Sequence, residues 1–349
     1  MIENILDIVI ENNASDLHLV DGYHPIIRVD GVLVPLSNIP ELNDAKITAI
    51  GNQLMSEYVV KRFIKNKSTD FSYSYKKKAR FRINIYKERG KTAIAMRHLP
   101  TEIRTLKDLK LPERLADFTQ YIQGLFLIVG PTGSGKSTTL ASMLNIINET
   151  RASHILTIED PIEYIFTPKK SLITQREIIN DTNNFHSAII YGLRQDPDVI
   201  MVGEMRDLET ISTAITAAET GHLVFATLHT NSAAQTIDRI IDGFPSYHQN
   251  QIRMQLSAIL LGVISQRLIP KKQGGVIPAL EIMIANGAIK TLIRDNKTHQ
   301  INTVISTSIE DGMISLDRYL EELLKKEEID IEIAKIYSLE KTIERKNIG

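Results

Sequence analysis

Hydrophobic and polar positions follow two different patterns along the chain, and the change falls near residue 100. Before it, helix and strand periods alternate. Apolar residues share one face of an expected helix over 2–12, and a second amphipathic helix fits 43–63. This mixture predicts a small α+β domain over residues 1–99. Its expected strands are 17–20, 26–29, 32–36, 80–86 and 92–97.

Residues 100–112, with a proline at each edge, are expected to be a linker into a second domain over 113–349. In that domain apolar runs alternate with helical stretches. The runs 125–129, 154–158, 199–202 and 223–228 are typical of parallel strands that are covered on both faces. The pattern therefore predicts an α/β domain with a mainly parallel sheet, and ligands are expected beyond the carboxyl ends of its strands.

A glycine-rich segment, Gly-Pro-Thr-Gly-Ser-Gly-Lys-Ser, follows the first of these strands and matches G-x-x-x-x-G-K-[ST]. Such glycines let backbone N–H groups surround phosphate oxygens. Lys136 then reaches the outer phosphates, and the Ser137 hydroxyl is placed to bind Mg²⁺. The alternative is a turn that binds nothing, but the preceding strand and following helix favour a nucleotide site. Its expected residues are Gly130, Thr132, Gly133, Ser134, Gly135, Lys136, Ser137 and Thr138.

Acidic residues follow the second and third strands of this domain. Glu159, Asp160 and Glu163 are explained most simply by a solvated turn at Pro161. Beside a phosphate site, however, we favour a carboxylate that orients or deprotonates the attacking water. Glu204 follows Gly203 at the end of the third strand and is the natural acidic partner for Mg²⁺. Its alternative role is to cap the helix that begins near Asp207.

Two histidines bracket the fourth strand. A structural role is the simpler interpretation of each, but His229 at the carboxyl end is a candidate for sensing the γ-phosphate. The extended strand would separate it from His222 by over ~20 Å, which argues against a shared metal site. In the small domain, Arg82 and Arg97 are expected to point to one side of a basic hairpin. They form either a solvated face or arginine fingers supplied from another domain or subunit.

The composition is that of a globular protein, with 43% hydrophobic and 24% charged residues. A net charge of −1 argues against a general nucleic-acid binder. The chain has no cysteine, which excludes disulfides and cysteine-ligated zinc. The N-terminus does not have the pattern of a signal peptide, and the longest apolar runs are too short to span a bilayer. We therefore expect a cytoplasmic protein.

Long ordered blocks of the sequence resemble the secretion ATPase superfamily of type IV pilus and type II secretion motors. The resemblance is strongest to the pilus retraction (twitching motility) ATPases, and it runs nearly end to end. It implies a RecA-like P-loop motor domain preceded by a small PAS-like α+β domain. The blocks are a Walker A motif at 130–138, an aspartate box at 157–163, an atypical Walker B motif at 196–207 and a histidine box at 217–230.

The resemblance also implies roles for individual residues. Glu163 would be the catalytic glutamate, Glu204 the Walker B acid, and His229 a neighbour of the γ-phosphate. Arg82 and Arg97 fall where the arginines of the family's first domain reach a bound nucleotide. The family implies a Mg²⁺-dependent ATPase that forms a homo-hexamer, with ATP bound where one subunit's small domain meets a neighbour's motor domain. Membrane association would be peripheral, at the inner face of the cytoplasmic membrane, through an inner-membrane pilus platform protein.

Within the superfamily, the sequence favours retraction over pilus assembly or type II secretion. Assembly ATPases carry a further N-terminal domain and usually a tetracysteine zinc site, whereas this chain begins with the small domain and lacks cysteine. One departure is Lys290, which replaces the arginine of the retraction family's Ala-Ile-Arg motif and loses its planar fork. Two rivals from other classes are a nucleic-acid translocase and a ring protein that binds ATP without hydrolysing it. The near-neutral charge disfavours the first, and Lys136, Glu163 and Glu204 disfavour the second.

Overall fold

The computed structural model describes all residues except 77, 100–101 and 340–349. The start of the expected linker and the end of the expected motor domain therefore lie outside the described residues. Contacts divide the chain into two compact units. Unit 1 comprises Met1–Glu102 and Pro161–Ile165, and unit 2 comprises Ile103–Asp160 and Phe166–Gly349.

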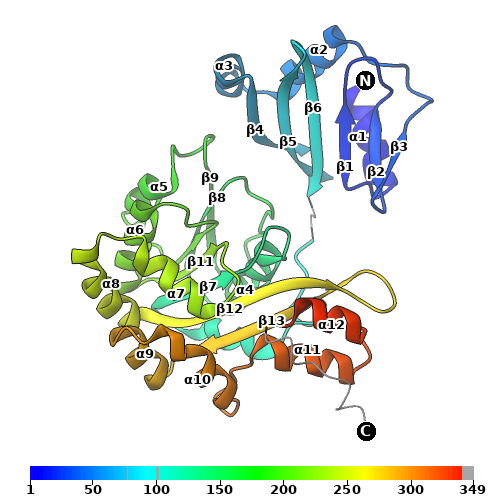
Figure 1. Ribbon diagram of the computed structural model, residues 1–349. Coiled ribbons are helices and arrows are strands. Elements are labelled where there is room, and N and C mark those ends of the chain that lie inside the picture. The colour runs from blue at the N-terminus through cyan, green and yellow to red at the C-terminus, as the bar shows by residue number, and fades with distance from the viewer. Residues whose placement is uncertain (77, 100–101, 340–349) are drawn as a thin grey trace. The chain divides into compact units, whose positions relative to one another are not determined.

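Unit 1 is built on a six-stranded antiparallel sheet in the order β3-β2-β1-β6-β5-β4 (Figure 1). Alternation along β5 places Phe81, Ile83 and Ile85 in the core and leaves Arg80 and Arg82 on the opposite face. The elements are α1 Ile2–Glu11, β1 Asp16–Leu19, β2 Ile26–Val29, β3 Val32–Pro35, α2 Asp44–Leu54, α3 Glu57–Asn66, β4 Ser68–Tyr75, β5 Ala79–Glu88 and β6 Lys91–Leu99.

The expected α+β class of this unit is confirmed, but two details of the prediction were wrong. The single helix expected over 43–63 is two helices, because Met55 is extended and the Ser56 side chain accepts a hydrogen bond from Val59 N as a new N-cap. Strand β4 was not predicted. Its serines and threonine interrupt the alternation of apolar and polar residues that would have predicted a strand. Pairing with β5 gives this segment its extended conformation instead.

Unit 2 contains a seven-stranded sheet in the order β13-β12-β7-β11-β10-β8-β9, parallel except for the edge strand β13. The predicted α/β class with a mainly parallel sheet is confirmed. The strands are β7 Gly124–Val129, β8 His154–Glu159, β9 Leu172–Glu177, β10 Val199–Val202, β11 Leu223–Leu228, β12 Leu260–Pro270 and β13 Val276–Ile284. Strands β9, β12 and β13 were not predicted.

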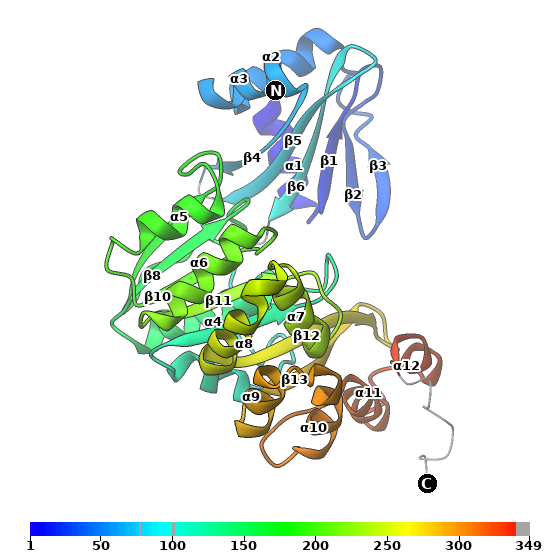
Figure 2. The same ribbon diagram turned by 60° about the vertical axis from the view of Figure 1, so that its left-hand side comes forward.

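Helices cover both faces of this sheet. Leu125, Leu127 and Val129 of β7 share one core with α5 to α10, and in Figure 2 α6, α7 and α8 lie in front of the strands. Phe126 faces the other side, where the ring of Phe118 in η1 lies 4.2 Å away. The helical elements are η1 Glu113–Gln120, α4 Lys136–Thr150, α5 Phe185–Gly192, α6 Leu208–Glu219, α7 Ala233–Asp242, α8 Ser246–Ile259, α9 Gly287–Arg294, η2 Thr298–Gln300, α10 Ile301–Thr307, α11 Leu316–Lys325 and α12 Ile331–Tyr337.

Among the described residues, no helix combines the length and the apolar composition that crossing a membrane would require.

Candidate nucleotide-binding site

The glycine-rich loop connects the buried strand β7 to helix α4, and its backbone requires glycine. Gly130, Gly133 and Gly135 have φ values of 145°, 77° and 85°, a region that other residues rarely adopt. A Cβ on Gly130 would also lie 2.2 Å from the carbonyl oxygen of Gln266. The loop can therefore adopt this backbone and pass close to β12 only because these positions carry no side chain.

Two side chains inside the loop have the chemistry of a phosphate site. Lys136 is only 8% exposed, and its Nζ donates to the carbonyl oxygens of Gly130 at 2.8 Å and Pro131 at 2.9 Å. The Ser134 hydroxyl is buried and has no hydrogen-bond partner among the described residues. Ser137 is exposed in the first turn of α4. A buried hydroxyl without a partner and a lysine at the first turn of a helix fit phosphate oxygens well.

Sequence reasoning missed Gln266, which holds this loop from strand β12. Its Nε2 donates to the Ser134 carbonyl oxygen at 2.8 Å, and its Oε1 accepts from Thr139 Oγ1 at 2.8 Å. The side chain is 2% exposed. The signal was present, because polar residues follow the apolar run 258–264 as they follow the other strands. Without a predicted strand there, nothing connected that signal to the loop.

Parallel pairing brings three strand ends to one edge of the sheet. Val129 of β7 is paired with Leu228 of β11, and Ala226 of β11 is paired with Val202 of β10. Neighbouring strands lie about 4.8 Å apart. The glycine-rich loop, His229 and Glu204 therefore emerge from adjacent strands at the same edge, which is where α/β sheets bind ligands.

Glu204 is held between two basic side chains at this edge. His229 Nε2 lies 3.0 Å from its Oε1, and Arg206 Nη2 lies 2.7 Å from its Oε2. Partial burial alone would raise the pKa of the Glu204 carboxyl. The hydrogen bond and charge of Arg206, with a smaller contribution from His229, outweigh burial and hold that pKa below its ordinary value. Glu204 is therefore ionised at neutral pH.

The structure explains why glycine precedes this acid. Gly203 N donates to the Ile158 carbonyl oxygen of β8 at 2.8 Å, so its backbone runs tightly along that strand. A Cβ on Gly203 would lie 3.1 Å from the same oxygen and 3.4 Å from the Glu159 Cα. A larger side chain would crowd β8, and the acid occupies the next position instead.

Simpler roles fit some of the other sequence candidates. Asp207, not Glu204, caps helix α6, with its Oδ1 accepting from Thr210 N at 2.8 Å. The His222 Nδ1 lies 2.9 Å from the Ala217 carbonyl oxygen at the end of the same helix, which is a structural contact. Glu159 is buried and accepts a hydrogen bond from Thr157 Oγ1 at 2.7 Å. Of the three acids near Pro161, Glu159 is thus a core residue rather than a solvated one.

Glu163 lies in the short segment Pro161–Ile165, which belongs to unit 1. Within that unit the segment contacts strand β5, since Arg80 Nε donates to the Ile162 carbonyl oxygen at 3.0 Å. Glu163 itself is half-buried. Its proposed catalytic role stays a prediction, and the structure brings it into the same unit as the two candidate arginines.

Arg82 and Arg97 are directly paired across β5 and β6 and therefore share one face of the sheet, as alternation predicts. Arg82 Nε lies 3.9 Å from Asp70 Oδ1, and Arg97 Nε lies 3.0 Å from Asp16 Oδ1. Both arginines are partly exposed, with 42% and 68% of their side chains accessible.

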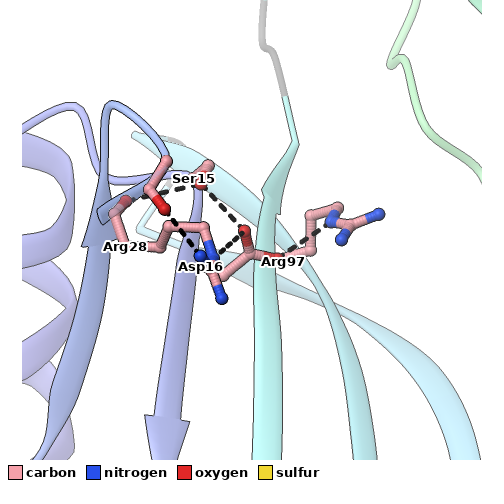
Figure 3. Close-up of polar contacts among 5 residues, drawn as sticks. Ser15, Asp16, Arg28 and Arg97 are labelled. Carbon is pink, nitrogen blue, oxygen red and sulfur yellow. Dashed lines mark hydrogen bonds and ion pairs between the residues drawn. The ribbon is translucent and has the colours of Figure 1, made fainter. Parts of the chain in front are cut away.

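Asp16 was missed as a residue that positions an arginine. Figure 3 shows its carboxylate between Arg28 and Arg97, with Ser15 beside it. Burial would raise the pKa of the Asp16 carboxyl, but hydrogen bonds from Ser15 and Arg97 and the charge of Arg97 lower it overall. Its negative charge orients Arg97 at neutral pH.

The chain belongs to the type II/IV secretion system protein family, whose model matches residues 1–334. It is 46% identical over 325 residues to the type IV pilus retraction ATPase PilT of Pseudomonas aeruginosa, covering 93% of this chain and 94% of that protein. It is 46% identical over 302 residues to a twitching motility protein of Neisseria gonorrhoeae, covering 86% and 80% of the two chains. A crystal structure of the pilus retraction motor PilT with bound ADP matches with a TM-score of 0.91, 46% identity and 97% coverage of both chains. The resemblance read from the sequence motifs is confirmed.

Replacing Gln266 by Leu should weaken nucleotide binding by about tenfold. The change leaves the buried Ser134 carbonyl oxygen and Thr139 hydroxyl without their partner, a loss of about 1–3 kcal/mol that loosens the loop. A titration with a fluorescent nucleotide analogue measures the effect. Gln273→Leu, at an exposed position in the turn between β12 and β13, is the matched control and should bind normally. Equal nucleotide affinity of the Gln266 and Gln273 variants would show that Gln266 does not support nucleotide binding.

Proposed function

We propose that this chain is an ATP-hydrolysing hexameric motor that powers retraction of type IV pili. Its class, an ATPase of the secretion family, follows from its family and its named relatives. The observation that carries the finer proposal is similarity at 46% identity to retraction and twitching motility proteins over most of the chain. The glycine-rich loop and the Glu204–His229 pair at adjacent strand ends support this proposal, because they are suited to binding phosphates and Mg²⁺.

In this proposal the loop from Gly130 to Ser137 binds the phosphates of ATP. Backbone amides and the Ser134 hydroxyl contact phosphate oxygens, and Lys136 exchanges its carbonyl partners for the outer phosphates. Ser137 and Glu204 would hold Mg²⁺, which neutralises developing phosphate charge when bound. Across the described residues, no group of three or more histidine and acidic side chains forms a protein-only metal site. Few protein ligands suit Mg²⁺ that is bound largely by phosphates and water.

The remaining candidates act on the reacting groups. Glu163 orients the attacking water and accepts its proton. His229, next to Glu204, is placed at the loop's edge of the sheet to contact the γ-phosphate. Loss of the γ-phosphate would then release the contacts that His229 and Lys136 make, and this release is the step that produces movement.

Arg82 and Arg97 stabilise phosphate charge from a neighbouring subunit in this proposal. They lie side by side on an exposed face of unit 1, and guanidinium groups suit phosphate recognition. A site shared between neighbours is completed at every subunit only when the assembly closes into a ring, and we propose a homo-hexamer. The ring would act on a platform protein of the inner membrane and be located at the cytoplasmic face of that membrane. No nucleic acid is expected in its cycle, given the net charge of −1.

Retraction is favoured over assembly for two reasons. The similarity to retraction proteins extends over 93% of this chain, and the chain has no cysteine for the tetracysteine zinc site usual in assembly motors. Lys290, the departure from the retraction motif, lies half-buried on α9, whose N-cap Asn286 accepts a hydrogen bond from Ile289 N. The helix that carries the motif is thus formed and capped with lysine in place.

Replacing Glu163 by Gln should preserve ATP binding and reduce the rate of phosphate release by at least ~100-fold, because an amide cannot accept the proton of water. Nucleotide titration and a phosphate-release assay separate the two effects. Glu209→Gln, an exposed change in the first turn of α6, removes an acid of the same kind and should leave turnover unchanged. Full hydrolysis by the Glu163 variant would exclude Glu163 as the catalytic base.

Mixed rings test whether neighbours share a site. Lys136→Ala and Arg97→Gln should each abolish turnover, and co-expressing them should restore about one site in four on random mixing. Recovery is expected because each variant supplies the half that the other lacks. A mixture of Arg82→Gln with Arg97→Gln is the control, since neither chain then carries an intact arginine pair. If the first mixture recovers no more activity than the control, the site lies within one subunit.

Deletion in the host distinguishes retraction from assembly. Cells that lack a retraction motor should be densely piliated and immobile on surfaces, because fibres are built but not withdrawn. Electron microscopy and a twitching assay provide the measurement. Bald cells would instead identify an assembly motor, and restored motility with the wild-type gene but not with Glu163→Gln would tie the phenotype to hydrolysis.

A further inference from the structure

A second cavity of unit 2 lies along helix α4, apart from the glycine-rich loop. Its volume is about 550 Å³, and its walls come from the segment before η1, from η1 and from the later turns of α4. No residue of the loop lines it. A separate cavity of about 270 Å³ adjoins the loop and is lined by Gly135, Thr138, Thr139 and Gln266. The larger cavity is therefore distinct from the phosphate site.

An unsatisfied hydroxyl lies in the wall of the larger cavity. Ser142 is 2% exposed, and its Oγ has no hydrogen-bond partner within the described part of the chain. A hydroxyl inside a helix usually bonds to the carbonyl four residues back, as Thr150 does in this same helix at 2.6 Å. Ser142 does not, so a polar group without a partner lies in the cavity wall, although its Oγ is almost fully covered in this side-chain position.

The rest of the lining defines the chemistry of that molecule. Leu106, Ala116 and Ile146 provide apolar walls, whereas Lys107 and Arg114 are exposed at the edges beside acidic residues. The volume lies in the range of roughly 300–1,000 Å³ that small-molecule sites occupy. The lining thus suits an amphipathic organic molecule with an apolar body against these walls and polar atoms toward the charged edges and solvent.

Two elements connect this cavity to the nucleotide site. Helix α4 begins at Lys136, and Ser142 follows about 9 Å farther along the same rigid helix. The segment before η1 also lines both cavities, with Leu106 and Lys107 at the larger one and Arg104 and residues 108–111 at the smaller one. Any molecule that displaces this segment or tilts α4 changes the surroundings of the loop.

We propose that the cavity along α4 is a regulatory site for a small amphipathic molecule, whose binding changes nucleotide affinity through α4 and the segment 104–111. Such coupling is reciprocal, so the bound nucleotide also changes the affinity of this site. The proposal does not depend on pilus retraction, because its readout is nucleotide binding to the purified protein.

The absence of cysteine allows a site-specific test. Ser142→Cys is nearly isosteric and gives the protein a single thiol in the cavity wall. Benzyl methanethiosulfonate should react there, the thiolate attacking the reagent's sulfenyl sulfur and releasing methanesulfinate to leave a benzyl disulfide. Mass spectrometry counts the label, and fluorescent nucleotide titration should then show at least a ~5-fold change in Kd, the lower end of typical allosteric coupling.

Controls separate the cavity from other effects. The wild-type protein has no thiol and should be unaffected by the reagent. Ser257→Cys, a buried position on α8 outside the cavity, should show no change in nucleotide Kd under the same treatment. Ile146→Cys, half-buried in the same cavity, repeats the test if Ser142→Cys folds poorly. Labelling by methyl but not benzyl methanethiosulfonate would show a space for water only and overturn the proposal. Complete benzyl labelling with unchanged nucleotide affinity would overturn it as well.

Discussion

The arrangement of the site depends on the parallel pairing of β7, β11 and β10. Parallel strands place all of their carboxyl ends at one edge, and the residues that follow those ends become neighbours although they are far apart in the sequence. The registers of Val129 with Leu228 and of Ala226 with Val202 set these positions within a few ångströms. The phosphate loop, His229 and Glu204 are near one another because the hydrophobic core keeps those strands in register.

Close backbone approaches then decide which residue types can stand at that edge. Gly130 passes beside the Gln266 carbonyl oxygen, and Gly203 runs along β8, so neither position accommodates a side chain easily. The acid after β10 is the next residue, Glu204. There it contacts Arg206 and His229, and the hydrogen bond and charge of Arg206 hold the pKa of the carboxyl below its ordinary value despite partial burial. The glycine that replaces the commoner acid of the Walker B pattern thus lies where the neighbouring strand leaves little room for a side chain.

Much of this could be predicted from the sequence, and the failures have physical reasons. The mainly apolar runs of the four central strands predicted a parallel sheet. The glycine-rich loop, placed between a strand and a helix, predicted a phosphate site. Gln266 was missed because its significance arises from β12 pairing with β7, a long-range contact without a local signal. Arg206 lies within the Walker B block at 196–207, yet only the fold shows it paired with Glu204. Likewise, pairing with Asp16 distinguishes Arg97 from the other arginines of its hairpin.

The hydrogen bonds of Gln266 affect how the loop responds to thermal motion. Glycine-rich loops have high backbone entropy and would ordinarily be among the first segments to open locally. Here the Gln266 side chain joins the Ser134 carbonyl oxygen and Thr139 to a buried strand that is itself paired on both sides. Opening the loop would break these two buried hydrogen bonds, so the link to β12 opposes the local opening that its glycine content favours.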